Sequence, residues 1–296
     1  MRVFLPDLPP FHALNLPGVT PFYYSRDSLP DGEAEGFVLW FLPAEQRREI
    51  LSRPGLKWVL TLTAGIDHVV SELPDGVALY NAHELHDRAV AQHALALMLA
   101  AGRGLHRFRD AQHGGHWSKA GSMYTLEGRQ VVIWGYGHIG RLLEGMLEPL
   151  GAEVSGLTSR STPDEVTAAL ERADDLVLLL PRTPSTRYIL NAERLALLKP
   201  TAWVYNLGRG ELIDPLALDA ALGAGALGGA ALDVTDPEPL PADSALWNRE
   251  NVVITPHVGS TTDDLIVRGA AHAQSVIGAF QAGGEAPGRV DPSRGY

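Results

Sequence analysis

Short apolar runs alternate with polar stretches in the first third of the chain, and most are bounded by proline, glycine or aspartate. Runs of this kind predict strands, here at residues 2–5, 18–24, 37–41, 57–61 and 77–80. Residues 44–52 have the composition and spacing of a helix. Because strands alternate with helical segments, we predict a mostly parallel sheet covered by helices.

The pattern changes between residues 83 and 108. Positions 89, 90, 93, 97 and 100 in this segment follow steps of one, three and four. Such steps place side chains on one face of a helix. We therefore predict a single long helix over residues 83–108 that connects two domains.

A second series of strands and helices begins at residue 130. Its predicted strands span residues 130–134, 153–157, 176–180, 202–206, 229–233 and 252–255. Its first predicted helix follows the strand at 130–134 and ends near residue 147. The other predicted helices span residues 163–171, 192–198, 215–224 and 262–281. The uninterrupted apolar run at 176–180 is typical of a central parallel strand that is buried on both faces.

Composition narrows the classes of partner. The chain is 45% hydrophobic and 20% charged, which is ordinary for a globular protein, and its formal net charge is −11. An acidic surface repels nucleic acid and anionic lipid, so we expect neither as a partner. An anionic substrate therefore needs local positive groups. The chain has no cysteine, which excludes disulfides, thiolate nucleophiles and cysteine-bound zinc.

Two segments bear on the compartment. Residues 1–18 are interrupted by prolines and lack the pattern of a signal peptide. The most apolar stretch, residues 89–101, is too short to cross a bilayer. Together with the absence of cysteine, these features predict a cytoplasmic protein.

Three glycines follow the predicted strand at 130–134 in the pattern G-x-G-x-x-G: Gly135, Gly137 and Gly140. The first glycine permits a tight turn, the second lets the backbone approach a pyrophosphate, and the third lets the helix pack closely on the strand. The helix N-terminus, with His138 and Ile139, adds N–H groups and positive potential. This arrangement predicts a dinucleotide site, the alternative being a glycine-rich turn without a ligand.

The next strand ends before Thr158, Ser159 and Arg160. A site that prefers NAD usually has an acidic residue here for the ribose 2′-hydroxyl. A guanidinium group between hydroxyls suits the 2′-phosphate of NADP instead. We therefore predict NADP(H) as the preferred coenzyme and NAD(H) as the alternative, in which Arg160 is a solvated loop charge.

The patterns together predict the α/β fold class, with two Rossmann-like, doubly wound parallel-sheet domains and an active-site cleft between them. The length of 296 residues agrees with two domains of roughly 150 residues each. We predict that residues 91–263 form the dinucleotide-binding domain. Residues 1–90 plus 264–296 then form a discontinuous substrate-binding domain.

Further segments carry a family resemblance. They read VVIWGYGHIG at 131–140, LPRTPST at 180–186, VYNLGRG at 204–210, ALDVTDPEP at 231–239 and ITPHVGS at 254–260. In this order they resemble the D-isomer-specific 2-hydroxyacid dehydrogenase family. TAGIDHV at 63–69 extends the resemblance, and the tail VDPSRGY is similar to the glyoxylate/hydroxypyruvate reductase branch.

The resemblance implies a catalytic triad of Arg209, Glu238 and His257. It implies that His257 donates a proton to the keto oxygen, a role for which histidine is the commonest side chain. Glu238 is expected to hydrogen-bond and orient His257, while Arg209 binds the substrate carboxylate or carbonyl. Taken singly, each could be an ordinary surface, turn or capping residue. The implied reaction is NAD(P)H-dependent reduction of a small 2-keto acid to the D-2-hydroxy acid.

The resemblance also implies contacts around the triad. Further coenzyme contacts are expected at Leu180, Pro181, Thr186, Leu207, Gly208, Asp233 and Gly259. Backbone N–H groups of Ala64, Gly65 and Ile66 are expected to bind the substrate carboxylate, in addition to Arg209 and His257. Trp40 is expected either to wall the substrate pocket or to pack in the core.

The histidines, Trp117 and Glu238 bear on metal binding, partners and rival functions. The histidines lack accompanying carboxylates, so we expect no metal site. Trp117, in the loop before the first strand of the second series, is expected to contact a second copy in a homodimer. One rival function is a non-catalytic NAD(H)-binding sensor or corepressor-like scaffold. Another is a formate- or phosphite-type dehydrogenase, and Glu238 argues against the formate type.

Overall fold

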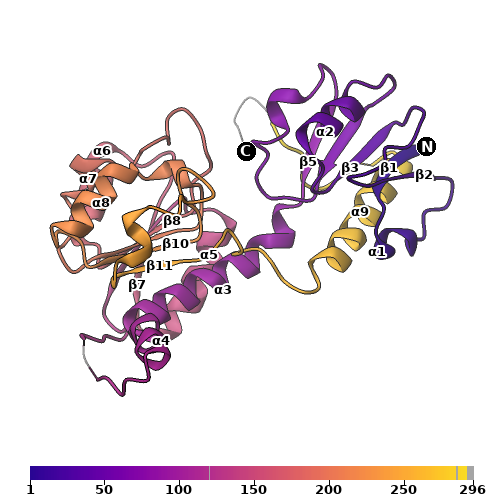
Figure 1. The fold of residues 1–296 in the computed structure, drawn as a ribbon. Coiled ribbons are helices and arrows are strands. Elements are labelled where there is room, and N and C mark those ends of the chain that lie inside the picture. The colour runs from indigo at the N-terminus through magenta and orange to yellow at the C-terminus, as the bar shows by residue number, and fades with distance from the viewer. Residues whose placement is uncertain (120, 285, 292–296) are drawn as a thin grey trace. The chain divides into compact units, whose positions relative to one another are not determined.

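The computed structural model describes residues 1–119, 121–284 and 286–291. The chain divides into two compact units, Met1–His86 with Thr261–Tyr296, and Asp87–Ser260. Each unit contains one parallel β-sheet with helices packed on it (Figure 1). The predicted pair of parallel α/β sheets is therefore confirmed. The last five residues of the tail VDPSRGY lie outside the described residues.

The first unit has a five-stranded sheet in the order β2-β1-β3-β4-β5. Its strands are β1 (Arg2–Pro6), β2 (Thr20–Tyr24), β3 (Gly36–Leu39), β4 (Trp58–Thr61) and β5 (Ala78–Asn81). Its helices are α1 (Pro9–His12), α2 (Ala44–Leu51), α9 (Leu265–Gln281) and the 3-10 turn η1 (Val70–Glu72). Alternate residues of β1 face opposite cores: Val3 packs with residues of α1 and α9, and Phe4 with residues of α2.

The second unit has a six-stranded sheet in the order β11-β10-β9-β8-β6-β7. Its strands are β6 (Gln130–Trp134), β7 (Glu153–Leu157), β8 (Asp175–Leu178), β9 (Trp203–Asn206), β10 (Gly229–Leu232) and β11 (Val252–Ile254). Its helices are α4 (Leu105–His113), α5 (His138–Leu147), α6 (Pro163–Arg172), α7 (Ala192–Leu195) and α8 (Pro215–Gly223). The 3-10 turns are η2 (Glu148–Leu150), η3 (Gly210–Leu212) and η4 (Ala245–Asn248), and α3 (His83–Gly102) enters this unit from the first.

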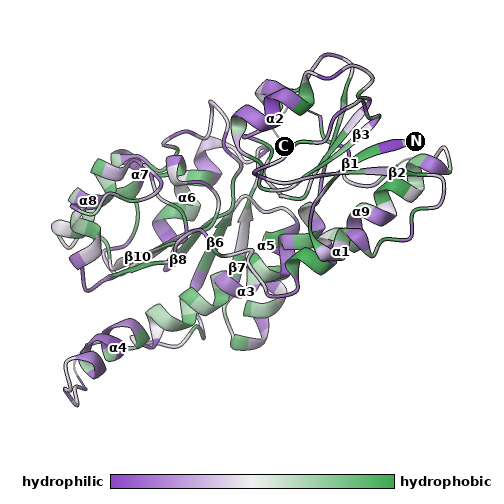
Figure 2. Cartoon of the chain, turned by 45° about the vertical axis from the view of Figure 1, so that its right-hand side comes forward, coloured by the Kyte–Doolittle hydropathy of each residue, from purple (hydrophilic) through white to green (hydrophobic). Residues whose placement is uncertain are grey.

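Both faces of the six-stranded sheet are covered. Val131 and Ile133 of β6 pack with residues of α3 and α5, whereas Val132 and Trp134 pack with residues of α6 and α8. Figure 2 shows β6 and β8 as hydrophobic and α4 as largely hydrophilic. Burial on both faces explains why the central strands have continuous apolar sequences.

The predicted single helix at 83–108 is wrong. The structure has two helices there, because α3 ends at Gly102 and α4 begins at Leu105. Gly104 between them has φ 64°, a left-handed conformation that ends a helix. The hydrophobic period continues across this break, so periodicity alone does not reveal it. Similarly, β8 ends at Leu178 rather than residue 180, and α9 begins at Leu265 rather than residue 262.

Parallel strands bring their following loops to one edge of the sheet. In the second unit this edge collects the loops after β6, β7, β8, β9, β10 and β11, which contain most of the predicted site residues. In the part of the chain that the structure describes, no helix is both long and apolar enough to cross a membrane.

Candidate active site

The glycine turn after β6 shows three different constraints. Gly135 has φ 101°, and a Cβ there would lie 2.5 Å from the carbonyl carbon of Leu179. A Cβ on Gly140 would lie 3.1 Å from Cγ2 of Ile133, so the third glycine allows close packing of α5 on its strand. A Cβ on Gly137 would meet no described atom within 4 Å. Gly137 therefore borders open space, while its two partners serve packing inside the unit.

Open space at Gly137 fits the pyrophosphate of a dinucleotide. Helix α5 begins at His138, and Gly137 offers no side-chain cap to its first turn. The first N–H groups of a helix have no partners within the helix and attract anions. Nδ1 of His138 lies 3.8 Å from Oδ2 of Asp87, and Ile139 packs against the core between the sheet and α3.

The turn after β7 is exposed, and local hydrogen bonds stabilise it. The backbone N–H of Thr158 donates to Oγ of Ser161 at 3.1 Å, and that of Arg160 donates to Oγ1 of Thr158 at 3.2 Å. Ser159 is exposed as well. The carboxylate of Glu165 accepts from the N–H of Thr162 in a capping box of α6. Glu165 therefore caps α6. Arg160 is the charged residue of the turn.

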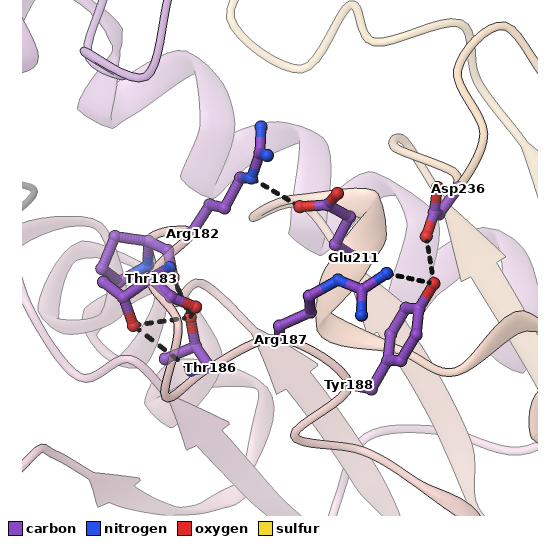
Figure 3. A network of polar contacts seen from close by, with 8 residues as sticks. Arg182, Thr183, Thr186, Arg187, Tyr188, Glu211 and Asp236 are labelled. Carbon is purple, nitrogen blue, oxygen red and sulfur yellow. Dashed lines mark hydrogen bonds and ion pairs between the residues drawn. The ribbon is translucent and has the colours of Figure 1, made fainter. Parts of the chain in front are cut away.

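The loop after β8 is closed by a threonine hydroxyl. Oγ1 of Thr186 donates to the carbonyl of Pro181 at 2.7 Å and accepts from the N–H of Thr183 at 2.8 Å (Figure 3). Leu180, which precedes Pro181, packs against the core beneath α6 and α8. Thr186, predicted as a coenzyme contact, thus has a structural role in the loop.

The turn after β9 carries Arg209. Asn206 spans this turn, because its Nδ2 donates to the carbonyl of Arg209 at 2.9 Å and its Oδ1 accepts from the N–H of Gly208 at 3.1 Å. Nη1 of Arg209 donates to the carbonyl of Gly208 at 2.8 Å. Leu207 is buried, and a Cβ on Gly208 would lie 2.7 Å from the carbonyl oxygen of Leu180. The sequence indicated Arg209 and missed Asn206, whose only signal is an amide at a strand end.

The loops that carry Arg209 and Glu238 are in backbone contact. A Cβ on Gly210 would overlap the carbonyl group of Thr235. Thr235 continues the chain from β10 toward Glu238, and its Oγ1 donates to the carbonyl of Pro237 at 2.9 Å. Glycine at position 210 therefore allows the two loops to lie directly against each other.

Glu238 and His257 form a hydrogen-bonded pair. Nδ1 of His257 lies 2.7 Å from Oε1 of Glu238, and the two side chains are 48% and 42% exposed. His257 has φ 53°, an uncommon conformation for a residue with a side chain. Its N–H donates to the carbonyl of Asp233 at 2.8 Å, which fixes this conformation. Because Nδ1 faces Glu238, Nε2 is the ring nitrogen left for another partner.

Asp233 organises the turn that carries His257. Its side chain is 4% exposed, and Oδ1 accepts from Oγ1 of Thr255 at 2.6 Å and from the N–H of Val258 at 3.0 Å. Oδ2 accepts from the N–H of Gly259 at 2.9 Å. The sequence suggested a coenzyme contact for Asp233; the structure adds an internal role that joins β10 to the turn after β11.

A histidine on α3 also contacts this carboxylate. Nε2 of His93 lies 2.9 Å from Oγ1 of Thr255 and 3.4 Å from Oδ1 of Asp233. Burial by itself raises the pKa of Asp233, but the hydrogen bonds that it accepts, beginning with His93, outweigh burial and lower the pKa to about 2. The sequence indicated His93 only as part of a helix face, because its partners are distant in the chain.

The remaining predicted residues belong to the first unit. Nδ2 of Asn81 donates to the carbonyl of Ala64 at 2.9 Å, and Oγ1 of Thr63 donates to the carbonyl of Gly65 at 2.8 Å. Ile66 is buried in the core on the α2 side. The carbonyl groups of Ala64 and Gly65 are thus hydrogen-bonded to side chains of the same unit.

Trp40 is partly buried and packs against the core on the α1 and α9 side, with its ring centroid 4.6 Å from that of Phe41. This position agrees with the packing role that was one of its two expectations. Within residues 1–119, 121–284 and 286–291, no group of three or more histidine, cysteine, aspartate or glutamate side chains is arranged to hold a metal ion.

Comparison with known proteins identifies the family. Residues 95–259 match the model of the NAD binding domain of D-isomer specific 2-hydroxyacid dehydrogenases. The chain belongs to this family. It carries the NAD-binding domain of these enzymes and is an oxidoreductase of the 2-hydroxyacid dehydrogenase type. The predicted resemblance is thereby confirmed.

Relatives support the same assignment. The chain is 32% identical over 229 residues to a glyoxylate reductase of Pyrococcus furiosus, covering 71% of this chain and 68% of the relative. It resembles the structure of a D-isomer specific 2-hydroxyacid dehydrogenase from Xanthobacter autotrophicus Py2 in complex with NADPH and MES (TM-score 0.85, 29% identity, covering 100% of this chain and 99% of that one). A similar structure is an NADPH-dependent glyoxylate/hydroxypyruvate reductase from Sinorhizobium meliloti in complex with NADP and sulfate (TM-score 0.85, 26% identity, covering 100% and 99%).

Proposed function

We propose that this 2-hydroxyacid dehydrogenase reduces a short 2-keto acid, such as glyoxylate or hydroxypyruvate, to the D-2-hydroxy acid with NADPH. The observation that carries the proposal is the contact of 2.7 Å between Nδ1 of His257 and Oε1 of Glu238, whose side chains are about half exposed. This pair lies beside the loop of Arg209. Relatives named glyoxylate reductase and glyoxylate/hydroxypyruvate reductase support the substrate class. The D stereochemistry rests on the family.

His257 is the proposed proton donor. When bound, the reduced nicotinamide supplies a hydride to the carbonyl carbon of the keto acid. As the C=O double bond becomes a single bond, a protonated His257 transfers the proton on Nε2 to the oxygen. Glu238 accepts from Nδ1 of His257 throughout, which keeps Nε2 directed away from Glu238. Because His257 is half exposed, it can regain its proton from water.

Arg209 is the proposed anchor for the substrate. A guanidinium group stays charged at any physiological pH and matches a carboxylate with two parallel donors. It also stabilises negative charge that develops on the keto oxygen. A local cation of this kind is needed because the net charge of the chain is −11. The N–H groups of Ala64, Gly65 and Ile66 are proposed as the second carboxylate site, with Trp40 as a neighbour of the substrate.

The coenzyme contacts are proposed from the second unit. The pyrophosphate would be held at Gly135, Gly137, His138, Ile139 and Gly140, where a side chain on the second glycine would take the available space. Thr158, Ser159 and Arg160 would bind the 2′-phosphate, which favours NADP(H) over NAD(H). The remaining proposed contacts are Leu180, Pro181, Thr186, Leu207, Gly208, Asp233 and Gly259.

Asp87–Ser260 is the proposed coenzyme unit, and Met1–His86 with Thr261–Tyr296 the proposed substrate unit. We also propose a cytoplasmic homodimer in which Trp117, 94% exposed, contacts the second copy. An exposed aromatic of this size is typical of an interface. Light scattering at micromolar concentration tests this, and a monomer would contradict it.

The function is tested by the decay of NADPH absorbance with glyoxylate, hydroxypyruvate and pyruvate at neutral pH, and separately of NADH. We expect rapid oxidation of NADPH by at least one of these acids. If both coenzymes bind and no keto acid oxidises either, the reductase proposal fails and a dinucleotide sensor takes its place.

A further inference from the structure

The loop after β8 contacts both loops that carry triad residues (Figure 3). Nε of Arg182 lies 2.5 Å from Oε2 of Glu211, two residues after Arg209. The backbone N–H of Tyr188 donates to the carbonyl of Glu211 at 2.6 Å. The loop is thus tied to the Arg209 turn near its start by the charge of Arg182 and near its end by the backbone of Tyr188.

The side chain of Tyr188 reaches the second triad loop. Its hydroxyl donates to Oδ2 of Asp236 at 2.8 Å, and Asp236 lies two residues before Glu238. Arg187 lies over the Tyr188 ring, with 4.2 Å from its guanidinium carbon to the ring centroid, and Nη2 donates to the hydroxyl oxygen at 3.1 Å. The hydrogen bond to Asp236 raises the pKa of Tyr188, so the hydroxyl keeps its proton and remains a donor.

The backbone of Tyr188 is held in an uncommon conformation. Its φ is 49°, in the left-handed region that residues with side chains rarely adopt. A conformation of this kind persists when surrounding contacts fix it. Here those contacts are the N–H bond to Glu211 and the hydroxyl bond to Asp236.

The segment from Asp236 to Glu238 is short and stiff. Glu238 lies between Pro237 and Pro239, and a proline ring fixes the backbone angle φ at its own position. Thr235 supports the same segment through its bond to the carbonyl of Pro237. We therefore expect a displacement of Asp236 to move Glu238 as well.

We propose that Tyr188 is a positioning residue for catalysis, which fixes Glu238 through Asp236 and thereby orients the ring of His257. This inference rests on the proposed function for its kinetic consequence, but its structural part concerns Glu238 and His257 alone. Tyr188 touches neither substrate nor coenzyme in this scheme. Its loss should lower kcat and leave KM and NADPH binding unchanged.

The test uses Tyr188→Phe, which keeps the ring beneath Arg187 and removes only the hydroxyl. We expect kcat to fall about tenfold, because small misplacements of catalytic groups are costly, with an unchanged Kd for NADPH by fluorescence and an unchanged Tm. Asp236→Ala removes the same bond from the other side, so the double variant should be no slower than the slower single variant. Tyr23→Phe, in β2 of the first unit, is the matched control and should keep the kcat of the wild type.

A second measurement does not depend on turnover. Nitrogen-15 NMR of the His257 ring reports its contact with Glu238. We expect Tyr188→Phe to shift the Nδ1 signal in the direction that Glu238→Gln shifts it, and Tyr23→Phe to leave it in place. If the wild type reduces no keto acid but this shift occurs, the proposed function fails and the positioning role stands. An unchanged Nδ1 signal in Tyr188→Phe would overturn the proposal.

Discussion

Two regions at the same edge of the six-stranded sheet are built in opposite ways. The turn that carries His257 is braced across strands, because Asp233 accepts from Thr255, Val258 and Gly259. The hydrogen bonds described for the turn after β7 join its own residues, and Arg160 in this turn is exposed. The proposed proton donor is thus fixed by the fold, whereas the proposed coenzyme selectivity depends on one exposed side chain, that of Arg160.

This contrast has a physical basis. A proton donor must lie within hydrogen-bond reach of the reacting oxygen, so a small error in its place is costly. A guanidinium group that binds a phosphate tolerates more freedom, since charge attraction acts over a longer range. Substitutions in the braced region should therefore reduce catalysis and stability, and substitutions in the exposed turn should change only the choice of coenzyme.

The largest effect is expected from Gly210→Ala. The added methyl group would overlap the carbonyl of Thr235 and force the loops of Arg209 and Glu238 apart. We expect kcat/KM for NADPH-dependent reduction to fall about 100-fold or more, with a lower Tm. Gly145→Ala in α5, where a Cβ meets no described atom within 4 Å, is the control and should retain activity. Equal activity of the two variants would contradict the backbone contact.

Asp233→Asn should change the response of stability to acid. The pKa of Asp233 is lowered from 3.8 to about 2 in the folded protein. Its stabilisation is therefore complete above the unfolded pKa and is lost as the pH falls from about 5 through 2. The shift corresponds to about 2 kcal/mol. Urea unfolding between pH 7 and 3 should show the first part of this loss in the wild type and in Asp31→Asn, an exposed control, but much less in Asp233→Asn. If the free energy of unfolding changed with pH in the same way in all three proteins, the stabilising role of the buried Asp233 carboxylate would be contradicted.

Gly137→Ala separates packing from coenzyme binding in the glycine turn. The methyl group would enter open space, so we expect an unchanged Tm. It would occupy the proposed place of the pyrophosphate and weaken both NADPH and NADH about tenfold, as a small steric overlap costs 1–3 kcal/mol. Fluorescence titration measures both constants. Wild-type affinity in this variant would mean that the pyrophosphate does not bind at this turn.

Arg160→Ala should have the smallest effect and the most selective one. Without the guanidinium group we expect NADPH to bind about fivefold more weakly, as for an exposed charge pair, and NADH to bind as before. The ratio of the two Kd values is the measurement, with Arg172→Ala in α6 as the control. An equal loss for both coenzymes would mean that Arg160 does not recognise the 2′-phosphate.

The sequence predicts what depends on local pattern. Alternating and continuous apolar runs indicate the strands because burial demands apolar residues, and the G-x-G-x-x-G spacing indicates the coenzyme turn. Gly104 illustrates the limit, since its left-handed φ breaks a helix that the hydrophobic period continues. A second limit is illustrated by Asn206, His93 and Tyr188. Because the turn or the fold determines their polar partners, the residue types alone gave no functional signal.

His257, oriented by Glu238, is the proposed donor of the proton in reduction of a 2-keto acid. His257→Gln keeps a polar side chain but cannot supply this proton. At neutral pH we expect the wild type to oxidise NADPH with glyoxylate or hydroxypyruvate, and His257→Gln to lose about 100-fold or more in kcat. Fluorescence should show the same Kd for NADPH in both. Turnover by His257→Gln at the wild-type rate would mean that another group donates the proton.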